Sequence, residues 1–96
     1  MSAEDQAFID RCLAAGSQEK IAARDVAPLI RDYYAMPNNG AGGSLHVMLD
    51  DGNYECAQFC LDWAIEAKDK CGEALCRVLL RCSYSQIKKA TRLSRT

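Results

Sequence analysis

Residues 54–70 form the longest amphipathic segment of the chain, and they limit its architecture more than any other segment. At about 100° per residue, the apolar side chains of this segment cover a wide arc of a helix and the polar ones a narrow arc. The pattern predicts a central helix enclosed on most sides, with Phe59 and Trp63 pointing into the core. The narrow arc is a predicted acidic ridge that consists of Glu55, Gln58, Asp62, Glu66 and Asp69.

Helical spacing recurs elsewhere in the chain. Apolar residues at i, i+3 and i+4 predict further helices, and Ser83 with Gln86 forms a capping box before the last one. No segment offers a convincing partner strand, so residues 45–49 are expected to form a short helix or an irregular segment that ends at Gly52. The sequence therefore predicts one all-α domain over residues 1–96, a small bundle of about five helices with an ordered glycine-rich loop. The further helices are expected at residues 3–15, 25–35, 75–82 and 84–93.

Overall composition is that of an ordinary folded protein. The chain is 49% hydrophobic and 26% charged, with a net charge of −1, so nothing draws it as a whole toward nucleic acid or a membrane. No run approaches the roughly 20 apolar residues that a membrane span needs. The first residues are polar and acidic, unlike a secretory signal, and we therefore expect a reducing, cytoplasmic location.

Six cysteines allow three interpretations. Five of them occupy apolar positions of the helical stripes, which favours buried free thiols. A metal site could combine Cys56 and Cys60 with Cys71 and Cys76, although paired CxxC motifs are absent. Disulfides are the third alternative, and the expected reducing compartment disfavours them.

Residues 40–53 hold the only histidine, several glycines and an acidic pair. If this segment is helical, His46 and Asp50 share one face, which is typical of a divalent-metal or general-base cluster. The alternative is that Asp50, Asp51 and Asn53 end one element and cap the next through local hydrogen bonds. One histidine supplies no second imidazole, no nucleophile is marked, and the glycines lack the lysine of a phosphate-binding loop. We expect no enzyme activity, no metal and no cofactor.

The C-terminal residues 77–96 contain Lys and Arg but no Asp or Glu. Clustered cations attract nucleic-acid phosphates, so a nucleic-acid interface through Lys88, Lys89 and Arg92 is one hypothesis. The competing interpretation is a solvated terminal face, or a face that lies along the protein's own acidic ridge.

The acidic ridge also permits two interpretations. It is either a solvated face or a docking stripe for a basic surface, because like charges four residues apart, as in Asp62 and Glu66, destabilise a helix by roughly 0.2–0.5 kcal/mol. The docking interpretation supplies a protein-binding hypothesis. Its candidate residues are Asn38, Asn39, His46, Asp50, Asp51, Glu55, Asp62 and Glu66.

Residues 42–53, with the sequence GGSLHVMLDDGN, resemble small proteins of tailed phages and prophages. The resemblance extends to residues 33–37 before this motif, to Phe59 and Cys60 after it, and more loosely to residues 79–86. No established activity of that family provides catalytic residues to carry over. The resemblance implies a phage accessory protein that works in the cytoplasm of a bacterial host. By analogy with other compact accessory proteins, the expected function is non-enzymatic binding of a host protein, including inhibition of host defence as by anti-CRISPR proteins.

Overall fold

The computed structural model describes residues 2–37 and 40–96, and within these ranges the chain is all-helical. The predicted all-α class is confirmed, with six α-helices and one short 3-10 turn where about five helices were expected. Within the described ranges, no helix combines the length and the apolar character that a membrane crossing needs. The elements in chain order are α1 (Ala3–Gly16), α2 (Ala23–Tyr34), α3 (Gly42–Asp51), η1 (Tyr54–Cys56), α4 (Ala57–Glu66), α5 (Lys70–Leu80) and α6 (Tyr84–Ser94).

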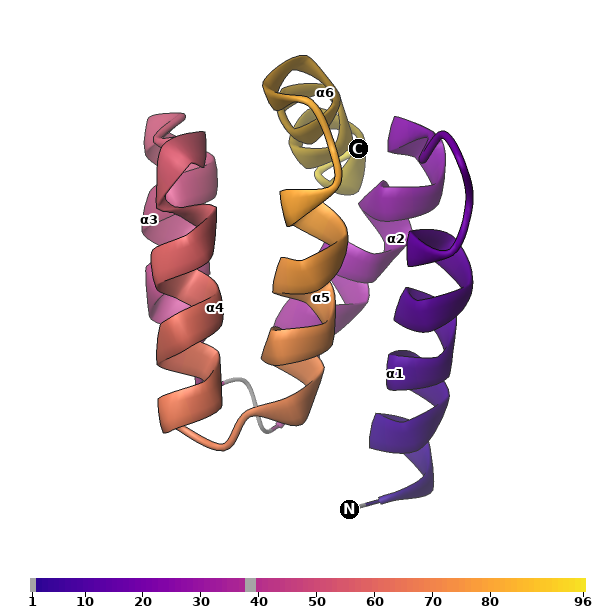
Figure 1. Cartoon of the computed structure of the whole chain (residues 1–96), viewed down its shortest axis with the longest axis vertical. Helices are drawn as coiled ribbons and strands as arrows, with labels where there is room; N and C mark the ends of the chain where they lie inside the picture. The colour runs from indigo at the N-terminus through magenta and orange to yellow at the C-terminus, as the bar shows by residue number, and fades with distance from the viewer. Residues whose placement is uncertain (1, 38–39) are drawn as a thin grey trace.

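Helix α5 is the central element of the bundle. Figure 1 shows it between α4 and α1, with α2 behind it and α6 across its upper end. Its Leu75, Cys76 and Leu79 side chains are almost completely buried, because neighbouring helices cover α5 on several sides. The central position predicted for residues 54–70 therefore belongs to the next helix along the chain.

Residues 54–70 do not form the single helix that their periodicity predicts. Helix α4 ends in a Schellman motif, in which Lys68 takes the left-handed conformation at φ 57° and the amide of Asp69 donates to the carbonyl of Ala64 at 2.9 Å. The chain then reverses and α5 begins at Lys70. Gly72 lies inside the first turn of α5.

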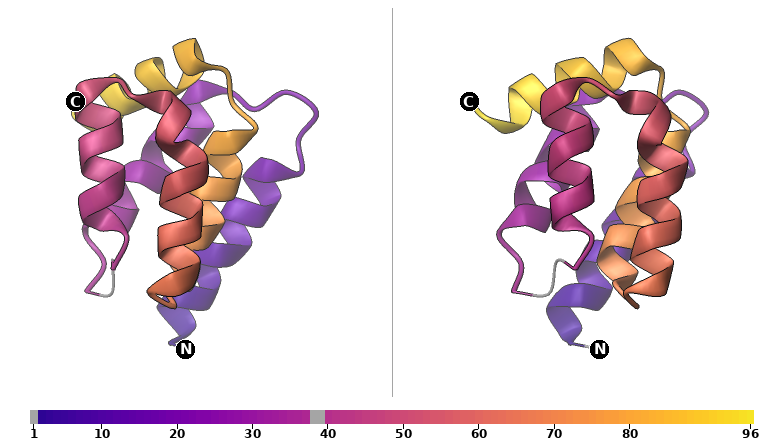
Figure 2. Two further views of the ribbon diagram at one scale, coloured as in Figure 1. Left: turned by 60° about the vertical axis from the view of Figure 1, so that its left-hand side comes forward. Right: turned by 90° about the vertical axis from the view of Figure 1, so that its left-hand side faces the viewer.

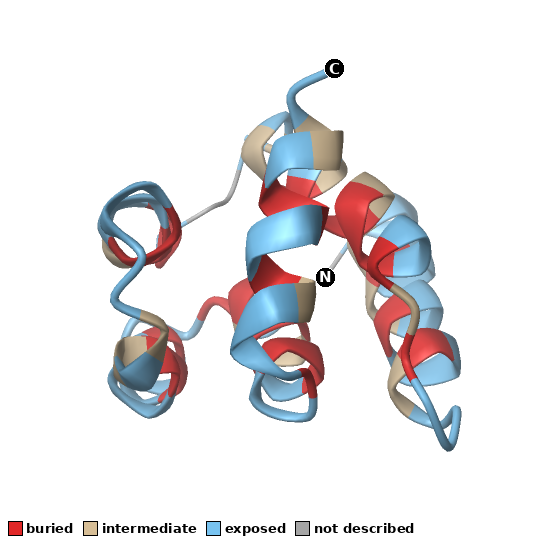
Figure 3. Ribbon diagram, turned by 90° about the horizontal axis from the view of Figure 1, so that it is seen from above, coloured by how far each residue is buried: buried red, intermediate tan, exposed pale blue. Residues whose placement is uncertain are grey.

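Helix α4 buries only a narrow face, so the prediction that Phe59 and Trp63 point inward is wrong. Phe59 is 60% exposed and Trp63 49% exposed. The helix lies at the edge of the bundle and packs mainly on α5 (Figures 1 and 3), so one side alone is covered. The buried face consists of Ala57, Cys60, Leu61 and Ala64.

Helix α3 confirms the expectation of a short helix that ends at Gly52. Gly52 adopts the left-handed conformation at φ 73°, and its amide donates to the carbonyl of Met48. The helix begins at Gly42, three residues before the expected segment 45–49, so Gly42 and Gly43 form its first turn rather than a loop. Asn53 makes no side-chain cap bond to η1. Figure 2 shows α3 and α4 side by side as an antiparallel hairpin.

One buried carboxylate ties this hairpin to the core. Asp69 is only 8% exposed and accepts hydrogen bonds from the Tyr33 hydroxyl at 2.5 Å and from the backbone amides of Ala41 and Gly72 at 3.0 Å each. Burial and the bond to Asp69 raise the pKa of Tyr33 above its ordinary range. The assignment of Asp69 to the exposed ridge is therefore wrong: it fixes the start of α3 against α2 and α5.

The cysteines behave as small apolar residues. All six are free thiols and all except Cys56 are buried, which confirms the buried-thiol prediction and leaves the disulfide alternative unrealised. Burial raises the pKa of Cys12 and Cys76 to about 12 and that of Cys71 to about 11. Across residues 2–37 and 40–96, no three His, Cys, Asp or Glu side chains gather closely enough to hold a metal ion.

Candidate functional site

An open groove separates α3 from α4 on the outer side of their hairpin. Its volume is about 350 Å³, near the lower end of the range of about 300–1,000 Å³ found for ligand pockets. The groove is open at its Gly43 end, where an added Cβ atom would meet no other atom within 4 Å. The lining residues are Gly43, Ser44, Val47, Met48, Asn53, Cys56, Phe59 and Cys60.

Both helices of the hairpin carry large apolar side chains that are exposed to water, and two of them, Val47 and Phe59, line the groove. Val47 projects from α3 and is 56% exposed, while Phe59, Trp63 and Ile65 project from α4. Phe59 and Trp63 are one helical turn apart, so both rings project from the outer face of α4. Exposed apolar side chains that form a contiguous patch mark interaction sites more often than ordinary solvated surface does.

Acidic side chains share the outer face of α4 with these rings. Asp62 and Glu66 are exposed and alternate with Phe59 and Trp63 at successive turns; we call these four residues the aromatic–acidic face. Gln58 donates a hydrogen bond to Asp62 at 3.0 Å. Glu55 is also exposed, in η1 at the start of the same ridge. Apart from Asp69, the predicted acidic ridge therefore lies at the surface. It is bordered by the rings of Phe59 and Trp63, which were expected in the core.

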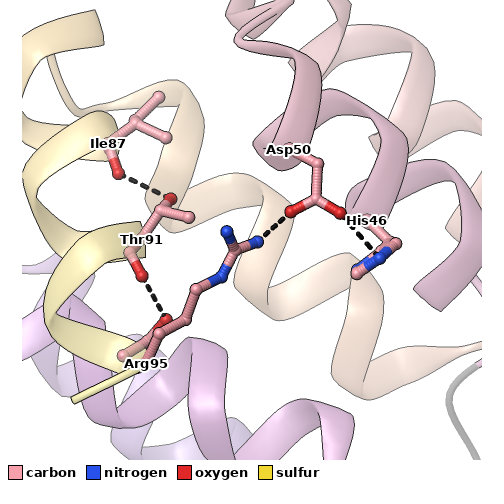
Figure 4. Close-up of polar contacts among 6 residues, drawn as sticks. His46, Asp50, Ile87, Thr91 and Arg95 are labelled. Atoms are coloured by element: carbon pink, nitrogen blue, oxygen red, sulfur yellow. Dashed lines mark hydrogen bonds and ion pairs between the residues drawn. The ribbon is translucent and has the colours of Figure 1, made fainter.

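A second cluster lies where α3 meets the end of α6 (Figure 4). The Nε2 atom of His46 lies 2.6 Å from Asp50 Oδ2, which confirms that these residues share one helix face. The guanidinium of Arg95 donates to the other oxygen, Oδ1, so both carboxylate oxygens are engaged. The ring of His46 packs edge-on against Tyr34 with centroids 5.9 Å apart. Arg95 thereby holds the end of α6 against α3.

The basic face of α6 borders the same region. A depression of about 420 Å³ lies between α3 and α6, and it has Asp50 and Asp51 on one side with Lys88 and Arg92 on the other. Lys89 is exposed but does not line this depression. The predicted capping box of Ser83 and Gln86 begins α6 as expected. The basic end thus faces acidic residues of α3 rather than the acidic ridge of α4.

The predicted partner-binding residues fall into two groups instead of one surface. His46, Asp50 and Asp51 lie on α3 next to α6, whereas Glu55, Asp62 and Glu66 follow the ridge of η1 and α4. Asn38 and Asn39 lie outside the described residues. The residues that sequence reasoning missed as surface or structural determinants are Val47, Phe59, Trp63, Asp69 and Arg95.

A signal for three of the missed residues is present in the sequence. On a helical projection, Phe59 and Trp63 lie directly beside Glu66, so they border the polar arc rather than the middle of the apolar arc. Asp69 also stands immediately before an apolar helical stripe, which is the ordinary position of an N-cap. Arg95 and Val47 carry no comparable signal.

Comparison of the chain with protein-family models, with curated proteins and with solved structures finds no match.

Proposed function

We propose that this chain is a non-enzymatic protein-binding module whose partner docks on the outer side of the α3–α4 hairpin. The observation that carries the proposal is the exposure of Phe59 and Trp63 beside an open apolar groove. Aromatic side chains dominate the energetics of protein interfaces, because one ring buries a large area with few rotatable bonds. Folding does not account for their position, since α4 packs on the core through its opposite face.

The second cluster supports a structural role better than a catalytic one. Both oxygens of Asp50 already have partners, in His46 and Arg95. A general base needs a free acceptor within hydrogen-bond reach of the proton that it removes. The His46–Asp50–Arg95 contact instead joins the C-terminal end of α3 to the C-terminal end of α6 and so holds the α3–α4 hairpin in place.

The biological setting is part of the same proposal. The resemblance of residues 42–53 to tailed-phage and prophage proteins supports an accessory protein that acts on a host protein in the bacterial cytoplasm. Inhibition of a host defence system, in the manner of an anti-CRISPR protein, is the specific form that we propose. Binding without catalysis is sufficient for such an inhibitor, because occupying a functional surface of the target blocks it.

Capture of host protein on the immobilised chain tests the proposal. The wild type, the double variant Phe59→Ala/Trp63→Ala and the control Leu13→Ala are compared in one bacterial lysate. Leu13 is a suitable control because it is 63% exposed on α1, a helix on the other side of α5. We expect one stoichiometric protein on the wild type and the control, and its loss from the double variant. Equal retention by all three chains would refute the proposed surface.

Nucleic-acid binding by α6 is the second candidate. Tyr84, Lys88 and Arg92 lie on one exposed helix face without any acid from α6 itself. Cations interleaved with an aromatic ring suit phosphates and an unstacked base. This candidate predicts salt-sensitive retention on immobilised DNA that the Lys88→Ala/Lys89→Ala/Arg92→Ala variant loses, together with unchanged behaviour of Phe59→Ala/Trp63→Ala.

A further inference from the structure

We infer that the partner segment is a cationic amphipathic α-helix, which inserts an apolar side chain between α3 and α4 and places Lys or Arg opposite Asp62 and Glu66. The inference rests on the proposed function and specifies the chemistry of the segment that the α3–α4 surface recognises. It follows from the charge of the hairpin, the spacing of the exposed rings and the shape of the groove.

The charge of the hairpin selects a basic partner. Residues 40–66 contain five acidic residues and no Lys or Arg; the five are Asp50, Asp51, Glu55, Asp62 and Glu66.

Part of this negative charge is already neutralised. Arg95 of α6 contacts Asp50, and Lys88 and Arg92 lie across the α3–α6 depression from Asp51. The acids of the ridge, Glu55, Asp62 and Glu66, are different, since no ion pair involves any of them within residues 2–37 and 40–96. The negative potential that remains is therefore concentrated beside the two exposed rings, where it opposes acidic partners and attracts basic ones.

The spacing of the exposed side chains matches a helix. Phe59 and Trp63 are four residues apart, as are Asp62 and Glu66, so each pair spans about 6 Å along α4. A partner helix that lies along α4 repeats its own side chains with the same period, at i, i+3 and i+4. The rings and the acids occupy neighbouring strips of the α4 surface, which requires apolar and basic residues on neighbouring strips of the partner.

The groove provides the place for an anchoring side chain. Val47 and Phe59 form its exposed edges, and Met48 and Cys60, which are buried, form its floor. Its apolar lining suits an aliphatic or aromatic side chain of the partner, because an apolar group gains most by leaving water there. Anchors that enter such a groove commonly lie on one face of an amphipathic helix.

A second copy of the chain is the competing occupant. The α6 face with Tyr84, Lys88 and Arg92 is basic and carries one exposed ring, so it resembles the inferred partner in composition. This face already borders Asp50 and Asp51 of its own chain, which lowers its free positive charge. A separate cationic helix is thus the better complement, and the oligomeric state decides between the two.

Selection of random peptides on the full-length chain tests the inference. A displayed library of 16-residue segments, a length of about four helical turns, is enriched on the wild type, and the best peptide is then synthesised with a fluorescent label. Its affinity is measured by anisotropy at about 0.05 M and about 0.5 M salt, and its helicity by circular dichroism. The variants are Phe59→Ala/Trp63→Ala, Asp62→Lys/Glu66→Lys and the control Leu13→Ala.

We expect enriched peptides with a clear excess of Lys and Arg and with apolar residues at i and i+3 or i+4. Affinity should fall at least about 30-fold for Phe59→Ala/Trp63→Ala, as for central interface residues. It should fall about tenfold for Asp62→Lys/Glu66→Lys, and this loss should shrink at high salt. Leu13→Ala should bind like the wild type. Circular dichroism of every variant verifies that the fold is kept.

Three results would overturn the inference. They are enrichment of acidic or proline-rich peptides, absence of any enriched peptide, and equal peptide affinity for the wild type and Asp62→Lys/Glu66→Lys. A wild-type dimer in sedimentation, dissociated by both Phe59→Ala/Trp63→Ala and Lys88→Glu/Arg92→Glu, would assign the surface to a second copy instead. Failure here is distinct from failure of the proposed function. If a lysate protein still requires Phe59 and Trp63 while no cationic helix is selected, the docking surface stands and the partner chemistry is wrong.

Discussion

Replacement of Asp69 by alanine should destabilise the protein more than replacement of any exposed acid. Asp69 accepts three hydrogen bonds, and its partners come from α2, from the turn before α3 and from α5. Tyr33 and Ala41 are both 0% exposed, so water cannot replace the carboxylate as an acceptor. The substitution therefore leaves two buried donors unsatisfied and removes the N-cap of α5.

The size of the effect follows from these three losses. A lost N-cap costs about 1 kcal/mol, and each buried donor without an acceptor costs about 1–3 kcal/mol. Because the three groups share one acceptor and relax together, we expect about 3–5 kcal/mol for Asp69→Ala. A chain of 96 residues has a total unfolding free energy of about 5–14 kcal/mol, so this single change removes a large part of it.

Two milder substitutions at the same site give an ordered series. Tyr33→Phe removes one hydrogen bond and leaves the carboxylate with two, for a loss of about 1–2 kcal/mol. Asp69→Asn keeps an oxygen that can accept from the amide of Gly72, so the N-cap of α5 remains. Its NH2 group faces the N–H of Ala41 and cannot accept a hydrogen bond, so we expect a loss of about 2–3 kcal/mol in unfolding free energy. Gly72→Ala belongs to the same test, since its added Cβ would lie 2.5 Å from Asp69 Oδ2.

Urea unfolding followed by far-ultraviolet circular dichroism measures the series. The matched control is Asp62→Ala, an exposed acid on α4 that should change the unfolding free energy by no more than about 0.5 kcal/mol. An Asp69→Ala protein within about 1 kcal/mol of the wild type would refute the buried-acceptor argument. So would a larger loss for Tyr33→Phe than for Asp69→Asn.

Three further predictions concern backbone conformation and the buried thiols. At the two left-handed positions, Gly52→Ala should destabilise the protein and Lys68→Gly should stabilise it, each by about 1 kcal/mol in urea unfolding. If both substitutions changed the unfolding free energy in the same direction, the left-handed conformation at these residues would be wrong. Stability should fall as the pH rises above about 9, by about 1 kcal/mol per buried thiol between pH 9 and 10. Stability falls rather than rises because burial raises the pKa of Cys12 and of Cys76 to about 12, so these thiols lose their protons at lower pH in the unfolded chain than in the folded one. Urea midpoints that do not change between pH 7 and 10 would contradict this prediction. In the native protein Cys56 should react first with a thiol reagent, and the rest only after unfolding, because it alone is not buried; two or more fast thiols would contradict the packing.

Local pattern was enough to predict most of the helices. The stripes of α1, α2 and α6 are regular, and the left-handed Gly52 ends α3 where glycine is the favoured residue. The His46–Asp50 contact was also predictable, since residues four apart meet whenever a segment is helical.

Tertiary contacts decided the features that local pattern missed. Most of residues 66–70 are good helix formers, so the pattern favours one continuous helix, and only the N-cap position of Asp69 indicates that α4 ends at this point. An apolar side chain also does not reveal whether it lies in the core or at the surface, and the apolar character of Phe59 and Trp63 predicts an inward position that the structure does not have. Asp69 was placed at the surface because a carboxylate is rarely buried without hydrogen-bond donors, and its donors come from distant segments.

The two faces of α4 differ in how closely the rest of the bundle constrains them, and this difference affects how the protein can change. Its inward side chains are mostly small and pack on α5, whereas Phe59, Asp62, Trp63 and Glu66 are exposed. A substitution on the outer strip therefore meets fewer packed neighbours than one on the inner strip. Under the proposed function, a lineage that carries this scaffold could follow an evolving target while the bundle beneath stays the same.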